Sequence, residues 1–239
     1  PSNLISPQIP HIYCCSLKTL KFINLLIDKT AYIIYYIIHN IIIFEACMNP
    51  LLSIKGTIIS GFVLSAVLVL AIGGKLVDIE HYLRWLHYLS GVTWIGLLYY
   101  FNFVQVPAMA SAIADKEPGP AAIGKYVAPL ALVWFRWGAV VTWITGALYL
   151  QDHGMLHAAF TLSDGAAGIG IGAWLGTIML FNVWVLIWPN QKKILGMVDA
   201  TPEEIAKAKK VALLASRTNT LLSIPMLLFM GYSHNGLGM

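Results

Sequence analysis

Histidine is the residue of this chain with the most distinctive chemistry, and five of its seven histidines stand beside apolar runs. His81 and His87 open one run, His153 and His157 lie in a polar segment between two later runs, and His234 follows the last run. Neutral imidazole is a common protein ligand of metal ions and of haem iron. Histidines that meet from several segments therefore indicate a metal or haem site.

The best axial pair for a b-type haem is His87 with His234, held between two helices of a bundle. His153 or His157 could replace either of them. Arg84 comes three residues before His87, so it lies on the same helical face and could pair with a haem propionate. The alternative is that each histidine is interfacial and keeps its polar tip in water.

His153 and His157 are also four residues apart, which is the spacing of a metal-binding helix, and Asp152 lies beside them. No third ligand is evident, and Gly154 disfavours a helix at this point. Zinc or copper is therefore the weaker alternative to haem.

Arg136, in VWFRWGAV, lies nine residues inside an apolar run, or ~13 Å along a helix. An arginine at such a depth is costly, so it indicates a functional contact. The counter-charge could be a cofactor propionate, an anionic substrate, backbone carbonyls or a partner chain. Trp134 and Trp137 flank Arg136 and could provide cation–π contacts. Alternatively, the side chain extends towards the cytoplasmic face.

The elements that must position these residues are membrane helices. The sequence is 58% hydrophobic and 11% charged, about half the charge of a soluble domain. Its apolar runs are continuous rather than alternating, which favours helices over a β-barrel. We predict an all-α, polytopic integral membrane bundle with five transmembrane helices, at residues 57–72, 81–103, 127–150, 168–188 and 211–232. The modest net charge of +4 indicates membrane orientation and no nucleic-acid partner.

Lysines set the predicted orientation in a bacterial inner membrane. They occur in the segments 104–126 and 189–210 but are absent from 151–167, so the first two are expected on the cytoplasmic side. Loop breakers are expected at Pro107, Pro118, Pro120, Pro189 and Pro202. Thr201 and Glu204 have the spacing of a capping box, which predicts a short surface helix running into the fifth span.

Residues 1–47 form an atypical leader, rich in isoleucine and without any of the 20 glycines. Two interpretations stay open: an additional, sixth membrane helix, or a start placed too early, with Met48 as the biological first residue. Residues 48–239 are expected to form a single membrane helical-bundle domain.

Three stretches carry a family likeness: RWLHYLSGVTWIGLLYYF, KYVAPLALVWFRWGAVVTWITGALYL and SRTNTLLSIPMLLFMGYSHN. They resemble the membrane domain of the bacterial membrane-bound urate hydroxylase (urate oxidase) family. The resemblance covers roughly residues 76–235, and His87 and His234 match positions where the family has histidine. Residues 217–220 read Arg-Thr-Asn-Thr where the family typically has Arg-His-Asn-Thr.

This resemblance implies a multi-span membrane domain that oxidises urate to 5-hydroxyisourate and passes electrons out through haem. The family's cytochrome c domain is expected to be lacking, so electrons would pass to a separate cytochrome or a quinone. A second hypothesis is a cofactor-free accessory subunit of a larger respiratory or photosynthetic membrane complex. A third, an anion or metal permease using Arg136, is disfavoured because the sequence has five spans and no inverted repeat.

Overall fold

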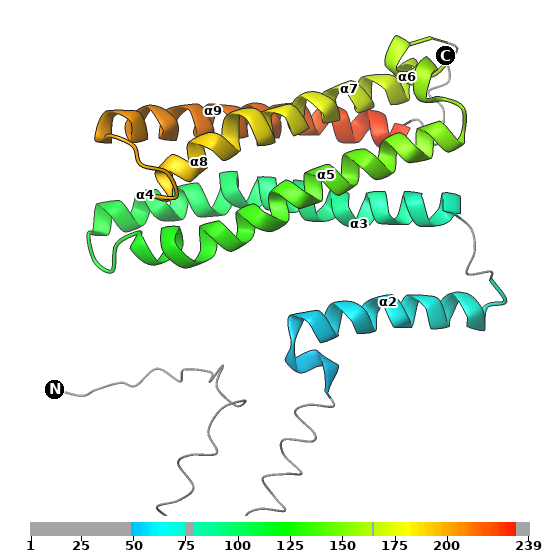
Figure 1. The fold of residues 1–239 in the computed structure, drawn as a ribbon, viewed down its shortest axis with the longest axis horizontal. Coiled ribbons are helices and arrows are strands. Elements are labelled where there is room, and N and C mark those ends of the chain that lie inside the picture. Colours follow the sequence, from blue (N-terminus) through cyan, green and yellow to red (C-terminus); the bar gives the residue numbers. More distant parts are fainter. Residues whose placement is uncertain (1–48, 75–78, 164, 233–239) are drawn as a thin grey trace, which may run out of the picture. The chain divides into compact units, whose positions relative to one another are not determined.

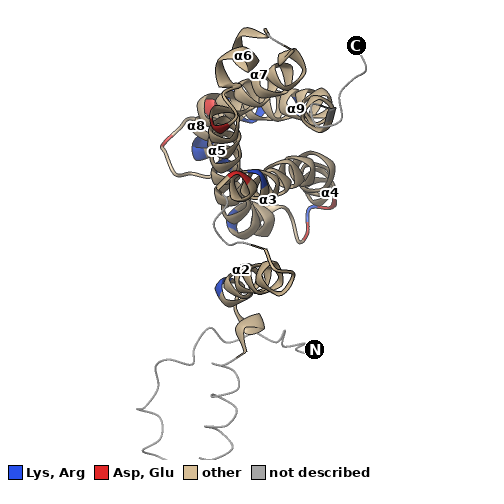
Figure 2. Cartoon of the chain, turned by 90° about the vertical axis from the view of Figure 1, so that its right-hand side faces the viewer, with Lys and Arg blue, Asp and Glu red and all other residues tan. Residues whose placement is uncertain are grey.

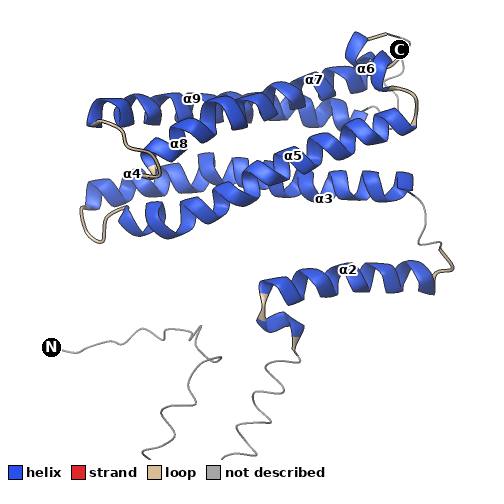
Figure 3. Ribbon diagram, in the orientation of Figure 1, coloured by secondary structure: helices blue, strands red, loops and turns tan. Residues whose placement is uncertain are grey.

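The computed structural model describes residues 49–74, 79–163 and 165–232. These residues form helices and connecting loops, with no strand in the described ranges (Figure 3). Five of the helical segments are long and apolar enough to cross a membrane. The predicted all-α, multi-pass membrane architecture is therefore confirmed.

The chain divides into two units, Pro1–Leu76 and Val77–Met239. The described part of the first unit holds the short 3₁₀ helix η2 (Pro50–Leu52) and helix α2 (Ile54–Ala71). The Ser53 hydroxyl accepts a hydrogen bond from the Gly56 backbone N–H at 2.9 Å and so caps α2. The predicted domain boundary at residue 47, and the leader itself, lie outside the described residues and stay predictions.

The second unit contains the other four candidate spans. In chain order its elements are α3 (Ile79–Tyr99), η3 (Tyr100–Gln105), α4 (Val106–Asp115), η4 (Ile123–Val127), α5 (Ala128–Asp152), α6 (Leu156–Thr161), α7 (Ala167–Phe181), η5 (Asn182–Ile187), α8 (Trp188–Ile194) and α9 (Pro202–Tyr232). The three η elements in this unit are π-helical. Each joins its neighbours without a loop, so α3–η3–α4, η4–α5 and α7–η5–α8 are three continuous rods.

These three rods and a fourth, the long helix α9, form two antiparallel pairs (Figure 1). α3 packs along α5, and α7 with α8 packs along α9, while smaller contacts join α5 to α7 and α3 to α9. Seen end-on, most of the ribbon carries neither acidic nor basic residues (Figure 2). The fully buried large apolar side chains come from three of the rods: Trp94, Leu98, Phe135, Met179 and Val183.

The predicted interruptions at Pro107 and Pro189 were wrong, because a continuous helix passes through each of them. Pro107, Pro129 and Pro189 each stand two residues after the end of a π-helical segment. A proline lacks the N–H that would bond four residues back, and its ring crowds that carbonyl. A wider π turn just before the proline moves the carbonyl away, so the rod continues.

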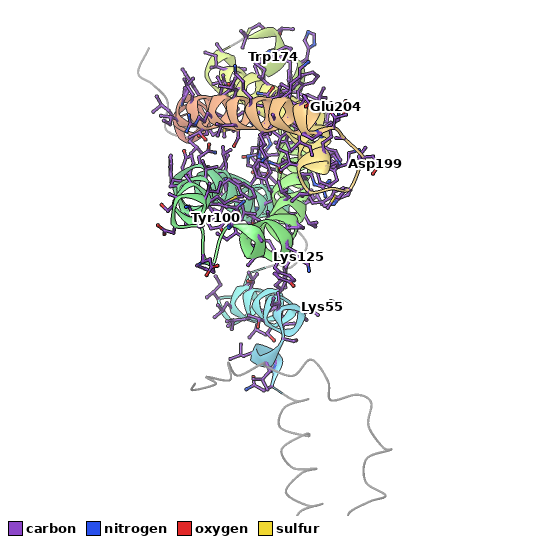
Figure 4. All side chains as sticks on the ribbon, turned by 90° about the vertical axis from the view of Figure 1, so that its left-hand side faces the viewer. Lys55, Tyr100, Lys125, Trp174, Asp199 and Glu204 are labelled. Atoms are coloured by element: carbon purple, nitrogen blue, oxygen red, sulfur yellow. The ribbon has the colours of Figure 1, made fainter. Side chains whose placement is uncertain are left out.

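The predicted capping box is present at the start of α9. The Glu204 N–H donates to the Thr201 hydroxyl at 3.2 Å, and the Thr201 N–H donates to the Glu204 carboxylate at 3.0 Å. The surface segment and the fifth span form one helix of 31 residues. Figure 4 looks onto this end of the second unit, where Lys125, Asp199 and Glu204 lie.

Candidate functional site

His87 lies in the interface between α3 and α5. Its Nδ1 is 2.7 Å from the backbone oxygen of Thr142, so the proton on this imidazole is placed on Nδ1. Nε2 has no hydrogen-bond partner among the described residues and keeps its lone pair. This is the arrangement of many ligating histidines, in which a carbonyl fixes the ring and leaves the other nitrogen for a metal.

The surroundings of His87 leave little freedom for the ring. A Cβ placed on Gly146 would lie 2.8 Å from Cε1 of His87, so α5 needs glycine at this position. One turn further along α3, the Thr142 hydroxyl donates to the Ser90 hydroxyl at 3.0 Å. These contacts hold α3 and α5 in one register around the imidazole.

His153 and His157 are both exposed and do not lie on one helix. The chain turns at Gly154, which has a φ of +67°, so His153 ends α5 and His157 belongs to α6. Nε2 of His153 is 3.3 Å from the Glu80 carboxylate at the start of α3, and its Nδ1 is 2.9 Å from the Tyr149 carbonyl. Within the described ranges no group of three or more His, Cys, Asp or Glu could hold a metal.

One end of the second unit holds four of the predicted residues, namely Arg84, His87, His153 and His157. Arg84 is half-buried on α3, one turn before His87. His234, the predicted second axial ligand, lies outside the described residues. The pairing of His87 with His234 therefore stays a prediction.

Arg136 lies elsewhere, ten residues or ~15 Å along α5 from Gly146. Its side chain is 9% exposed, and its Nε donates to the Leu132 carbonyl at 3.1 Å. The guanidinium carbon is 3.2 Å from the ring centroid of Trp188 and 5.7 Å from that of Trp184.

The predicted cation–π partners, Trp134 and Trp137, were therefore the wrong tryptophans. Both are more than half exposed. Side chains one or two residues apart on a helix point in different directions, so Trp134 and Trp137 do not face Arg136. The rings that cover the guanidinium come from η5 and α8, and residue spacing within α5 could not reveal them.

A buried polar layer joins the helices near the middle of the second unit. Asn182 donates to Asn219 at 2.8 Å, and Asn219 donates to the Met179 carbonyl at 3.0 Å. The Tyr99 and Ser223 hydroxyls are 3.0 Å apart. These bonds connect α9 to both α3 and the α7–η5 rod.

The polar layer continues on η3, where Asn102 donates to the Ser216 hydroxyl at 2.8 Å. Two buried oxygens on η3 have no partner among the described residues: Oδ1 of Asn102 and Oε1 of Gln105. Sequence reasoning missed the polar residues of η3 and η5. Their signal was an amide side chain inside an apolar run.

A shallow apolar groove of about 480 Å³ runs between α5 and the α7–η5 rod. Its lining is aromatic and aliphatic apart from one threonine, and consists of Trp137, Val140, Trp143, Thr177, Leu180, Phe181 and Trp184. The Trp143 indole N–H donates to the Thr177 hydroxyl at 2.8 Å, and Trp137 packs edge-on against Trp184.

Comparison with known proteins connects the C-terminal third of the chain with a family. The model of the family described as "Urate oxidase N-terminal" matches residues 153–239. This segment is similar to the N-terminal region of urate oxidases. The match confirms, for these residues, the resemblance drawn from the sequence. No curated protein and no solved structure matches the chain.

The urate oxidase-related segment begins at His153 and covers α6 to α9. It therefore includes Asn182, Asn219 and Ser223 of the polar layer. His87 and Arg136 precede the matched segment, on the two helices that pack against it.

Proposed function

We propose that this chain is the membrane domain of a redox protein of the urate oxidase type, and that it binds a b-type haem through His87. The observation that carries the proposal is the 2.7 Å contact between Nδ1 of His87 and the Thr142 carbonyl. It orients the imidazole and leaves Nε2 available as an axial ligand.

The residues around His87 fit such a ligand. Gly146 leaves the ring its space, and Ser90 with Thr142 keeps α3 and α5 in register. Arg84, one turn away on α3, is available to pair with a propionate. His234 would supply the second imidazole.

When bound, the haem would supply one-electron transfer between a substrate and a separate carrier. The protein orients the ligating imidazole, and the apolar side chains of the bundle keep water out. The proposed carrier is a separate cytochrome or a quinone, and the proposed location is a bacterial inner membrane.

A reduced-minus-oxidised visible spectrum of the purified full chain tests the proposal. We expect a b-type α-band in the wild type and its loss in His87→Ala, with Val92→Ala as the control because Val92 is exposed on the same helix. Retention of the band in His87→Ala would reject His87 as the ligand. Absence of any band in the wild type would favour a cofactor-free accessory subunit.

The relationship to urate oxidases makes urate the first substrate to test. Anaerobic addition of urate to the oxidised protein should develop the reduced spectrum, with two haems reduced per urate. Oxidation of urate to 5-hydroxyisourate takes up one water and releases two electrons and two protons. A haem that dithionite reduces and urate does not would keep the redox proposal and reject urate as the donor.

A further inference from the structure

Two cations converge on one tryptophan where α8 begins. The Arg136 guanidinium lies 3.2 Å from the ring centroid of Trp188, and the Lys192 ammonium lies 5.9 Å from the same centroid. Like charges gathered on one ring repel each other unless an anion lies between or beside them. Two cations on one ring therefore indicate a binding site for an anion.

The described residues do not supply that charge. No Asp or Glu oxygen in them lies within 4.0 Å of a nitrogen of Arg136 or Lys192, whereas the neighbouring Lys193 pairs with Glu204 at 3.4 Å. Arg136 uses Nε for the Leu132 carbonyl, and its two terminal nitrogens make no hydrogen bond to a described residue. Those nitrogens can bind one oxyanion in a bidentate manner.

The apolar groove begins beside these cations. Trp184 lines the groove and is also the second ring over the Arg136 guanidinium. From there the groove follows Trp137, Phe181 and Trp143 towards the other end of the bundle. A ligand that satisfies both features has an anionic head and a long apolar body.

We propose that this surface binds one anionic phospholipid of the surrounding membrane. Its phosphate contacts Arg136 and Lys192, and one acyl chain lies in the groove between α5 and the α7–η5 rod. Lys192 stands in the last turn of α8, next to the loop expected on the cytoplasmic side, which is the depth of a lipid headgroup.

Native mass spectrometry of the detergent-purified full chain tests this proposal, with dioleoyl phosphatidylglycerol and dioleoyl phosphatidylcholine as probes. We expect one phosphatidylglycerol to be retained preferentially. Lys192→Gln should weaken its retention about fivefold, the usual effect of one basic residue near an anionic lipid. Arg136→Gln should weaken it at least as much, and Arg136→Lys should restore part of it.

Lys193→Gln is the matched control, because Lys193 is adjacent in sequence but pairs with Glu204. Its retention of phosphatidylglycerol should equal that of the wild type. Equal retention of the two lipids would overturn the proposal, as would equal effects of Lys192→Gln and Lys193→Gln. Displacement of the lipid by millimolar inorganic phosphate would also overturn it, since the site would then be one for free anions.

The groove is tested separately. Trp137→Ala removes a wall of the groove without touching either cation, and should weaken retention of the dioleoyl lipid more than that of a short-chain phosphatidylglycerol. An equal effect on both lipids would show that the acyl chain lies elsewhere. Lys192→Gln keeps the headgroup contact testable even if Arg136→Gln does not fold.

Discussion

The side-chain amide of Asn182 donates to Oδ1 of Asn219 at 2.8 Å, and both side chains are buried between the α7–η5 rod and α9. Asn219 in turn donates a hydrogen bond to the Met179 carbonyl. Inside a membrane such bonds stabilise the pairing of helices, because a polar group that loses its partner cannot hydrogen-bond to water instead.

Asn219→Ala should therefore destabilise the bundle. It removes two inter-helix hydrogen bonds, each worth roughly 0.6–1.7 kcal/mol in a membrane protein. We expect a loss of about 1–3 kcal/mol, measured by unfolding in mixed micelles. The control is Asn190→Ala, because Asn190 bonds only within its own rod, to Leu186. Equal losses in the two variants would contradict the inter-helix role.

Gly146→Ala should displace the imidazole of His87. The new methyl group would lie 2.8 Å from Cε1, so the ring must leave the Thr142 carbonyl. If His87 binds haem, the visible spectrum of the variant should weaken or shift. Gly96→Ala is the control, since a Cβ there meets nothing within 4 Å. If the protein binds haem and the spectrum of Gly146→Ala is unchanged, the haem ligand is not His87 in this ring position.

Thr201→Ala should loosen the first turn of α9. The Thr201 hydroxyl accepts from the Glu204 N–H, and loss of such a cap costs about 1 kcal/mol. Hydrogen–deuterium exchange should accelerate in the amides of residues 203–206, since Pro202 has none, and nowhere deeper in the helix. Thr218→Ala, at an exposed position in the same helix, should leave this exchange unchanged.

Pro189→Ala should tighten the rod that contains η5. Alanine restores an N–H that can bond the carbonyl four residues back, and it removes the ring that widens the turn. We expect slower hydrogen exchange in residues 182–190. Pro202→Ala should change little, because the N–H at the start of a helix lacks an intrahelical partner in any case. Similar exchange in Pro189→Ala and the wild type would mean that the π turn has another cause.

Much of the fold was predictable because length and apolar composition alone define a membrane span. The ends of the rods were not, since Pro107 and Pro189 are normally helix breakers. Here each follows a π turn that accommodates it, and π geometry leaves no mark on hydrophobic periodicity. The cap at Thr201 was predictable because it depends on residues only three apart.

Less of the candidate site than of the fold was predictable from the sequence. The position of Arg136 inside an apolar run marked it correctly as unusual, but both of its ring partners come from a rod about fifty residues further along the chain. His87 was identifiable by type, whereas its contact with the Thr142 carbonyl depends on the register of α3 against α5. The hydrogen bonds of Asn102 with Ser216 and of Asn182 with Asn219 depend on how α9 packs against the other rods, which the sequence alone does not reveal.

The wide turn of η5 makes the length of that segment as constraining as its composition. A π turn holds about one residue more than an α turn, because its hydrogen bonds span five residues rather than four. Deleting a single residue between Asn182 and Ile187 would let this segment close into α turns. Trp188 would keep its place over the guanidinium of Arg136, but Pro189 would lose the wide turn that accommodates it. The same deletion inside α7 would instead rotate Trp188 and Lys192 by ~100° about the rod and take both away from Arg136.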